Sequence, residues 1–255
     1  MDVQRWIRHF EGNRGRLEAD WRAPVTLPAE VKAPVAASLA IFQLGETGDG
    51  GTLRRYAARL RGRPGFEGYE EALDMFVKEE NRHAATLAVM VRRLDGELIR
   101  KQWTAAVFKV MRRPLNLEFE LQILLTAELL AEAYYEILRR EIDDGPLRDA
   151  CSRILKDEVG HTGFHAEFFG AVQRNWPAAW RGLWRMQFAV IHRVTCKVVW
   201  WDHRKCFRAL GVHRGDYDRL CRRARRTFLR RMEIAIRTDR PAAGAEPRGR
   251  GRRAA

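Results

Sequence analysis

Carboxylates interrupt the apolar side of four helical patterns in this sequence. In each pattern apolar residues recur at i, i+3, i+4 and i+7, and one glutamate stands where an apolar residue is expected. The four positions are Glu46, Glu80, Glu128 and Glu158. An unpaired buried charge is costly or is neutralised by a shift of its pKa. Four buried carboxylates that lie together therefore require cations.

Two of these glutamates are followed three residues later by histidine, at His83 and His161, which places Glu and His on one helix face. Turns at residues 62–65 and 143–146 would set Glu46 beside Glu80, and Glu128 beside Glu158, about 16 residues or ~25 Å from each turn. Two such hairpins, packed together, bring four carboxylates and two imidazoles into one core. This is the ligand set of a dinuclear metal site. For an isolated Glu-x-x-His pair, a solvated helix face is the alternative.

The motifs Glu79-Glu80-Asn81-Arg82-His83 and Asp157-Glu158-Val159-Gly160-His161, with the isolated Glu46 and Glu128, resemble the ferritin-like carboxylate di-iron proteins. This superfamily includes acyl-carrier-protein desaturases, ribonucleotide reductase small subunits, bacterial multicomponent hydroxylases and quinol hydroxylases. The resemblance covers about residues 31–176. It implies a ferritin-like four-helix bundle that holds two iron ions, with manganese or a mixed manganese–iron pair as variants.

The resemblance also assigns roles to individual residues. It implies that one metal is bound mainly by Glu46, Glu80 and His83, and the other by Glu128, Glu158 and His161. Glu80 and Glu158 would bridge the two ions. Glu79 and Asp157 would each hydrogen-bond the histidine of the opposite motif and so fix its ring.

Three further features lie near these residues. His165, one turn beyond His161, is a candidate seventh ligand or hydrogen-bond donor, with a core histidine as the alternative. Tyr135, after Glu128, is a candidate electron relay, with a packing role as the alternative. Glycines at 45, 48, 50 and 51 surround Glu46 and indicate a bulge or a close approach of two helices.

The elements that must position these residues are long helices, because nothing in the sequence alternates as a strand does. Breakers rich in Gly and Pro predict helical segments at about 31–61, 69–94, 117–142, 147–176, 178–210 and 217–236, with a shorter stretch at 97–111. The predicted class is all-α, a four-helix bundle with additional C-terminal helices. The predicted organisation is a leader (1–30), the bundle (31–176), basic Trp-bearing helices packed on it (177–237) and a disordered basic tail (238–255).

Charge is concentrated at the C-terminal end of the 255-residue chain. Residues 176–255 hold 21 Lys and Arg against 6 Asp and Glu, whereas the first 175 residues hold 26 against 27. Arginines at 222, 223, 225 and 226 indicate an anionic partner: an acidic protein, lipid head groups or nucleic acid. Nucleic acid is disfavoured because no nucleic-acid-binding motif accompanies them, and the resemblance to carrier-protein desaturases favours an acidic protein. Trp176, Trp180 and Trp184 recur at helical spacing, which predicts a core stripe, with a lid or a membrane contact as alternatives.

Other features limit the class of protein. The four cysteines have no CxxC spacing, which favours reduced thiols in a cytoplasmic protein. The sequence has no signal-like apolar region and no long uncharged run, which argues against secretion and membrane spanning. The oligomeric state is open, a homodimer being one option.

The expected function is an O₂-activating non-haem di-iron oxidoreductase that desaturates, hydroxylates or N-oxygenates a small or carrier-tethered organic substrate. Its two electrons would come from an external donor, because the chain has no flavin or iron–sulfur motif. One alternative is a non-catalytic ferritin-like protein for metal handling or peroxide protection. Another is a helical nucleic-acid-binding protein whose buried glutamates are structural.

Overall fold

The computed structural model describes residues 1–14, 19–47, 50–102 and 117–238. Eight helices and no strands occur in these residues. They are α1 Val3–Gly12, α2 Ala29–Glu46, α3 Gly51–Ala58, α4 Tyr69–Arg93, α6 Leu117–Glu141, α7 Gly145–Gln173, α8 Ala178–Ala209 and α9 Arg214–Thr238. The predicted all-helical class is confirmed for this part of the chain. The predicted tail from 239 onward, and most of the stretch at 97–111, lie outside it.

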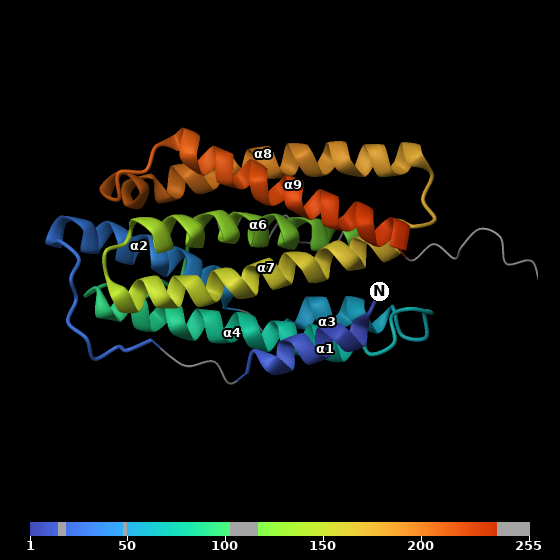
Figure 1. Cartoon of the computed structure of the whole chain (residues 1–255), viewed down its shortest axis with the longest axis horizontal. Helices are drawn as coiled ribbons and strands as arrows, with labels where there is room; N and C mark the ends of the chain where they lie inside the picture. The colour runs from blue at the N-terminus through green and yellow to red at the C-terminus, as the bar shows by residue number, and fades with distance from the viewer. Residues whose placement is uncertain (15–18, 48–49, 103–116, 239–255) are drawn as a thin grey trace, which may run out of the picture.

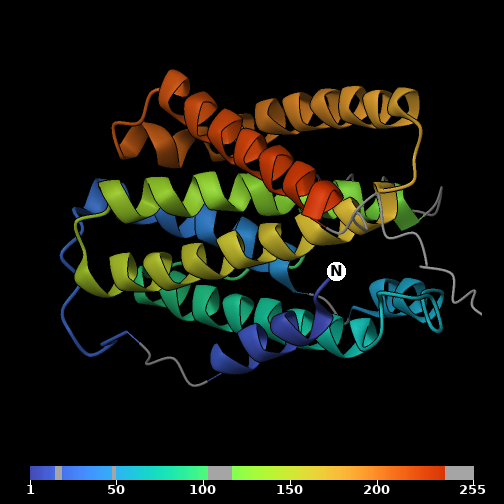
Figure 2. The ribbon, with the colours of Figure 1, turned by 45° about the vertical axis from the view of Figure 1, so that its right-hand side comes forward.

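The helices form three layers (Figures 1 and 2). In the middle layer α2 packs on α4, α6 packs on α7, and α4 contacts α7. On one side α1 and α3 lie against α4; on the other, α8 covers α2 and α6, and α9 covers α6 and α7. The four helices that carry the predicted glutamate ligands thus surround one interior: α2, α4, α6 and α7. The basic C-terminal helices α8 and α9 form an outer layer.

The turn between α6 and α7 follows directly from its residues. Asp144 caps α7, and its carboxylate accepts a hydrogen bond from the backbone N–H of Leu147 at 3.1 Å. Pro146 occupies the first turn of the helix, where a missing N–H has no cost. The predicted turn at residues 143–146 therefore reverses the chain and sets α7 antiparallel to α6.

The expectation of one helix over residues 31–61 is wrong, because the structure has two. α2 ends at Glu46 and α3 begins at Gly51. Gly50 has φ 66°, and a Cβ there would lie only 2.7 Å from Val77 Cγ2 of α4. Glycine at this position allows both the left-handed backbone and the close approach to α4. The glycine density noted around Glu46 therefore marks the end of a helix.

The leader contains a helix that the sequence analysis did not predict. Asp2 caps α1 by accepting from the backbone N–H of Arg5 at 2.9 Å. Four apolar residues of α1 are buried against the core: Val3, Trp6, Ile7 and Phe10. They follow the i, i+3, i+4, i+7 spacing of an amphipathic helix.

Two helix contacts depend on close approach to α7. A Cβ at Gly160 would lie 2.6 Å from His9 Nε2, so this position must stay small for α1 to pack here. A Cβ at Gly170 would lie 2.6 Å from the Cβ of Ala235, where α7 and α9 meet. Small residues on α7 thus allow α1 to pack on one side of it and α9 on the other.

The outer layer is joined to the rest of the molecule by a buried aromatic face. Trp184 and Phe188 of α8 pack together and join the core beside Phe169 of α7. The core role predicted for the Trp stripe therefore holds for Trp184, whereas Trp180 is exposed. All four cysteines are buried free thiols. No helix in the described part of the chain is long and apolar enough to cross a membrane.

Candidate metal centre

Four side chains of the two Glu-x-x-His motifs converge between α4 and α7. Glu80 and His83 of α4, with Glu158 and His161 of α7, each offer one ligand atom, and all four atoms lie within 4.8 Å of one another. Glu158 and both histidines are buried, and Glu80 is nearly so. The spacing therefore places all four side chains in the interior, not on a solvated face.

Each motif glutamate lies between the two histidine rings. Glu80 Oε1 is 2.9 Å from His161 Nδ1 and 3.8 Å from His83 Nδ1. Glu158 approaches the same two nitrogens, at 3.7 Å for His161 and 3.4 Å for His83. Both carboxylates thus face both Nδ1 atoms, which is the arrangement that a carboxylate shared by two cations needs.

The outer nitrogens of the same rings contact a second pair of acids. His83 Nε2 lies 3.2 Å from Asp157 Oδ2, and His161 Nε2 lies 3.1 Å from Glu79 Oε2. Each histidine of one motif thus meets the acid that precedes the glutamate of the other, the pairing that the resemblance implies. These contacts hold each Nδ1 toward the interior.

The two isolated glutamates lie at the same place. Glu128 Oε2 of α6 is 3.2 Å from His161 Nδ1. Glu46, the last residue of α2, shares a hydrogen bond with Glu80. Tyr135 also reaches this point, with its hydroxyl 3.5 Å from Glu46 Oε1. The structure therefore brings together all six residues predicted as ligands.

The charges of the cluster divide into two groups. Burial and the neighbouring Glu80 raise the pKa of Glu46, and burial with Glu80 and Glu158 raises that of Glu128. Although burial alone would raise the pKa of Glu80 and Glu158, the adjacent histidines lower both. Without a metal, Glu46 and Glu128 therefore hold protons more tightly than free carboxyls, while Glu80 and Glu158 favour the anion.

The histidine pKa values shift in the opposite sense to that expected from burial. Burial lowers the pKa of His83, but the carboxylates of Asp157, Glu158 and Glu80 outweigh it and raise the pKa to about 10. For His161, burial is likewise outweighed by Glu80, Glu128, Glu158 and Glu79. Two imidazolium cations thus balance the carboxylates, at positions that divalent cations would neutralise as well.

Three inward-facing atoms indicate that a metal can replace the protons on the two histidine rings. Glu80 Oε1, His83 Nδ1 and Glu158 Oε1 are buried, and each lies within 4 Å of an oppositely charged group, yet none makes a hydrogen bond of normal geometry to a described residue. Buried polar atoms are normally hydrogen-bonded, so orphaned donor atoms that face one another require another explanation. Carboxylate oxygen and imidazole nitrogen are both ligands of iron and manganese. The residues present therefore fit a metal centre.

His165 lies beside this group. The ring is fully buried beside Phe76 and Phe164. Burial and the positive charge of His161 lower its pKa to about 3. Neither ring nitrogen has a hydrogen-bond partner in the described residues. The structure thus places His165 as a neutral ring against one side of the cluster.

Three neighbours of the cluster were missed from the sequence: Phe10, Asn13 and Thr162. Asn13, directly after the unpredicted helix α1, donates to Glu79 Oε2 at 3.3 Å, and Phe10 of α1 packs on the His161 ring. Thr162 donates a short hydrogen bond to Glu132, whose pKa burial raises to about 7. The periodic apolar residues of α1 would have located Phe10, but no sequence signal pairs Asn13 with Glu79.

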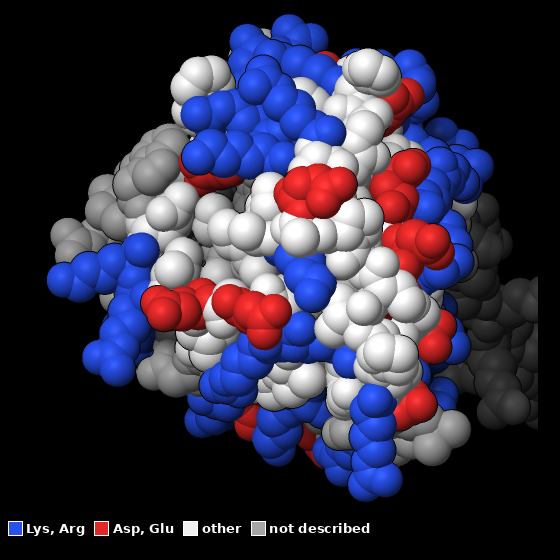
Figure 3. Space-filling view, turned by 90° about the vertical axis from the view of Figure 1, so that its left-hand side faces the viewer, with Lys and Arg blue, Asp and Glu red and all other residues white. Residues whose placement is uncertain are grey.

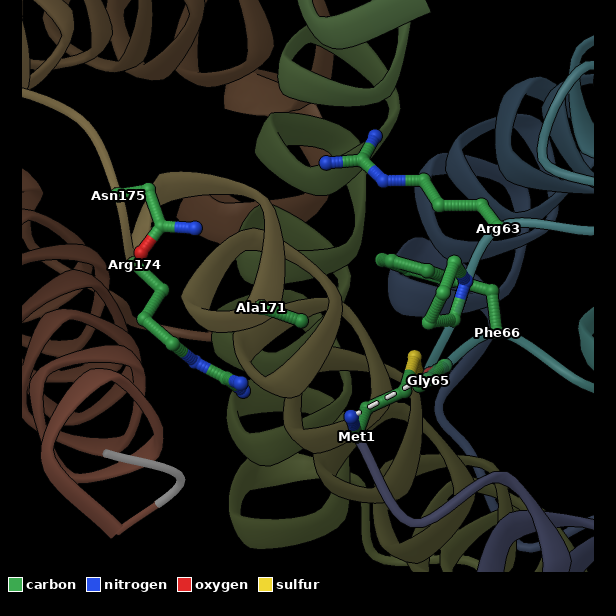
Figure 4. Close-up of a pocket in the computed structure, with 8 residues that line it drawn as sticks. Met1, Arg63, Gly65, Phe66, Ala171, Arg174 and Asn175 are labelled. Atoms are coloured by element: carbon green, nitrogen blue, oxygen red, sulfur yellow. Dashed lines mark hydrogen bonds between the residues drawn. The ribbon is translucent and has the colours of Figure 1, made fainter. Parts of the chain in front are cut away.

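Two cavities lie away from the cluster. A cavity of about 180 Å³ is bounded by Met1, the loop Arg63–Phe66 and the end of α7, with the Arg63 and Arg174 side chains on opposite walls (Figure 4). A second, of about 630 Å³, lies between α2 and residues 94–99. Neither is lined by a residue of the cluster.

Comparisons with protein-family models, with curated proteins and with solved structures gave no match to this chain. The interpretation of the cluster therefore depends on its own geometry and charge.

Proposed function

We propose that α2, α4, α6 and α7 form a ferritin-like bundle that binds two iron ions, and that the protein is an O₂-activating oxidoreductase. The observation that carries this proposal is the crossed pairing of the two motifs. Each histidine turns Nδ1 toward both shared carboxylates and Nε2 toward the acid of the opposite motif. A set of buried ion pairs needs no such symmetry.

The ligands would be divided between the two ions. Glu46 and His83 would bind one ion, Glu128 and His161 the other, and Glu80 and Glu158 both. A reduced di-iron pair of this kind supplies the electrons and the binding site for activation of O₂. The substrate would be a small or carrier-tethered organic molecule, and an external donor would restore the reduced pair.

The protein side chains have three tasks in this proposal. Asp157 and Glu79 hold the histidine rings in position through Nε2. Phe10 and Phe76 pack on His161 and exclude water. Glu132, with a pKa of about 7 and a hydrogen bond from Thr162, can hold a proton near the site at neutral pH.

The first test is metal content. The chain reconstituted with ferrous iron should hold two ions, and the double variant Glu80→Ala/Glu158→Ala should hold none, because both shared ligands are lost. Elemental analysis after gel filtration measures this. Glu136→Gln is the matched control, since Glu136 is on α6 but pairs with Arg139 and Arg140 instead. Full metal content in the double variant would refute the site.

The second test separates catalysis from storage. Substrate-dependent O₂ uptake by the reduced, iron-loaded protein supports an oxidoreductase. Iron loading with O₂ or peroxide consumption that no organic substrate accelerates would instead support metal handling or peroxide protection. Carrier-bound and free fatty-acyl chains are the first substrates to compare, because of the desaturase resemblance.

A further inference from the structure

The outward face of α8 carries a row of exposed apolar side chains. Its members are Trp180, Leu183, Met186, Val190, Val194 and Trp201, and all are roughly half exposed or more. The opposite face of the same helix, with Trp184, Phe188 and Phe207, is buried in the core. The row is thus a second apolar face and not the side by which α8 packs on the bundle.

The row is long and straight. Steps of three or four residues keep successive members on one side of a helix, and Val194 to Trp201 is a step of seven. From Trp180 to Trp201 the row extends for about 32 Å at 1.5 Å per residue. The exposed Lys197 occupies the position of this face between Val194 and Trp201. Exposed apolar surface of this kind marks an interaction site. In Figures 1 and 2, α8 lies at the outer edge of the molecule, so this face is accessible.

Cations border the row along its C-terminal half. Arg193, Lys197, Lys205 and Arg208 are exposed on α8, and the Arg204 guanidinium lies 3.9 Å from the Trp201 ring centroid. The only acidic residue of α8, Asp202, accepts a hydrogen bond from Gln102 at 3.4 Å. On α9, Arg222, Arg223 and Arg226 are exposed as well. Figure 3 shows Lys and Arg over the upper part of one end, where α8 and α9 lie, and also over its lower part.

This combination selects one kind of partner. A second copy of the chain, seated on the row, would bring like charges together along the contact. An acidic protein would satisfy the cations but would not need a straight apolar row of this length. An anionic lipid surface satisfies both, since phosphate groups pair with the cations and the apolar side chains enter the boundary of the acyl chains. Tryptophans at both ends match the preference of this side chain for that boundary.

We propose that the outward face of α8 binds the surface of an anionic membrane, with the helix lying parallel to it. The row would enter the interface, while Lys and Arg side chains extend to the lipid headgroups. This proposal does not depend on the metal centre, which lies between other helices.

The test is binding to lipid vesicles. The whole protein should co-sediment with vesicles of phosphatidylcholine containing about one-third phosphatidylserine, and weakly with phosphatidylcholine alone. The tryptophan fluorescence should shift to shorter wavelength on binding, because Trp180 and Trp201 leave water. The variant Arg193→Gln/Lys197→Gln should bind the anionic vesicles about 25-fold less tightly, at about 1 kcal/mol for each cation removed.

A pair of valine variants tests the row itself. Val190→Asp should reduce binding at least about tenfold, because it places a charge in the apolar interface. Val89→Asp is the matched control, since Val89 is an exposed valine near the C-terminal end of α4. Equal loss in both variants, or no binding of the unaltered chain to anionic vesicles, would overturn the proposal.

Two other results would also overturn it. A dimer in analytical ultracentrifugation that Val190→Asp dissociates would assign the row to a second copy. Salt-sensitive binding of an acidic carrier protein that competes with vesicles and depends equally on Val190 would assign it to a protein partner. The metal content of Val190→Asp should be unchanged. This would show that either result concerns the row and not the metal centre.

Discussion

Each histidine of the cluster is held by carboxylates at both ring nitrogens. The inner nitrogens face Glu80 and Glu158, and the outer nitrogens face Asp157 and Glu79. The outer acid fixes the ring and increases the negative charge on the inner nitrogen when that nitrogen is deprotonated. A single ring contact therefore sets both the orientation and the basicity of a ligand.

Asp157→Asn should retain the fold but weaken metal binding about 10- to 100-fold, since the amide retains the shape but loses the charge that orients His83. Competition with a chelator measures the affinity. Asp149→Asn, at an exposed acid on the same helix, should leave the affinity unchanged. If the two variants behave alike, Asp157 is not a supporting residue.

At the scale of the helices, small residues decide how closely the layers approach. Gly170 of α7 meets Ala235 and the backbone carbonyl of Met232 on α9, at 2.6 and 3.2 Å from a Cβ built on the glycine. Gly182 of α8 has no atom within 4 Å of the equivalent position. Of these two glycines within helices, Gly170 is closely packed against a neighbouring helix and Gly182 faces open space.

Gly170→Ala should therefore destabilise the protein by about 1–3 kcal/mol, because α9 must move away from α7. Gly182→Ala should stabilise it by up to about 1 kcal/mol, because alanine favours the helix and meets nothing. Urea unfolding followed by circular dichroism gives both values. If Gly170→Ala leaves the free energy of unfolding unchanged, α7 and α9 can move apart without loss of stability.

Comparison of these helices with the sequence shows which parts can be predicted. Periodicity and breakers place α4, α6 and α7 within a few residues, since each is long and regularly amphipathic. The break after Glu46 is not predictable in the same way, because the same glycines fit a bulge within one helix. The position of α1 was predictable from Asp2 and from its apolar spacing, but the helix is short and lies in a polar segment.

The contacts of the candidate site also include some that the sequence predicts and some that it does not. Spacing alone brings Glu80, His83, Glu158 and His161 together, because each pair lies on one face of a regular helix. The close contact of Glu46 with Tyr135 depends on where α2 ends, and that of Asn13 with Glu79 on how α1 packs. Such contacts arise from tertiary packing, which one sequence does not encode locally.

For the whole molecule, the metal-free cluster predicts an unusual dependence of stability on pH. The pKa of His83 is about 10 in the folded protein, against 6.5 for a free histidine, so its stabilising contribution is complete below pH 6.5 and is lost toward pH 10. Glu46 and Glu128, with raised pKa values, lose their contribution as pH rises above 4.5, whereas His165, with a pKa lowered to about 3, gains its contribution between pH 3 and 6.5 and opposes them. Glu79 and Glu80, with lowered pKa values, lose their contribution as pH falls below 4.5.

The metal-free protein should therefore be most stable between about pH 4.5 and 6.5 and should lose stability toward pH 10. Bound metal should reverse the alkaline trend, because it requires neutral imidazoles and ionised carboxylates. Thermal unfolding of both forms across a pH series measures this. Parallel pH curves for the two forms would show that metal and protons do not compete for these side chains.

The buried cysteines have a consequence for the movement of the outer layer. Cys196 and Cys206 are on α8, Cys221 is on α9, and Cys151 is on α7 in the middle layer. A thiol reagent reaches such sulfurs only during transient opening, so its reaction rate reports the opening equilibrium. If α8 and α9 lift from the bundle as a unit, their three thiols react together. The reaction rates of these thiols thus measure how often the outer layer separates from the bundle.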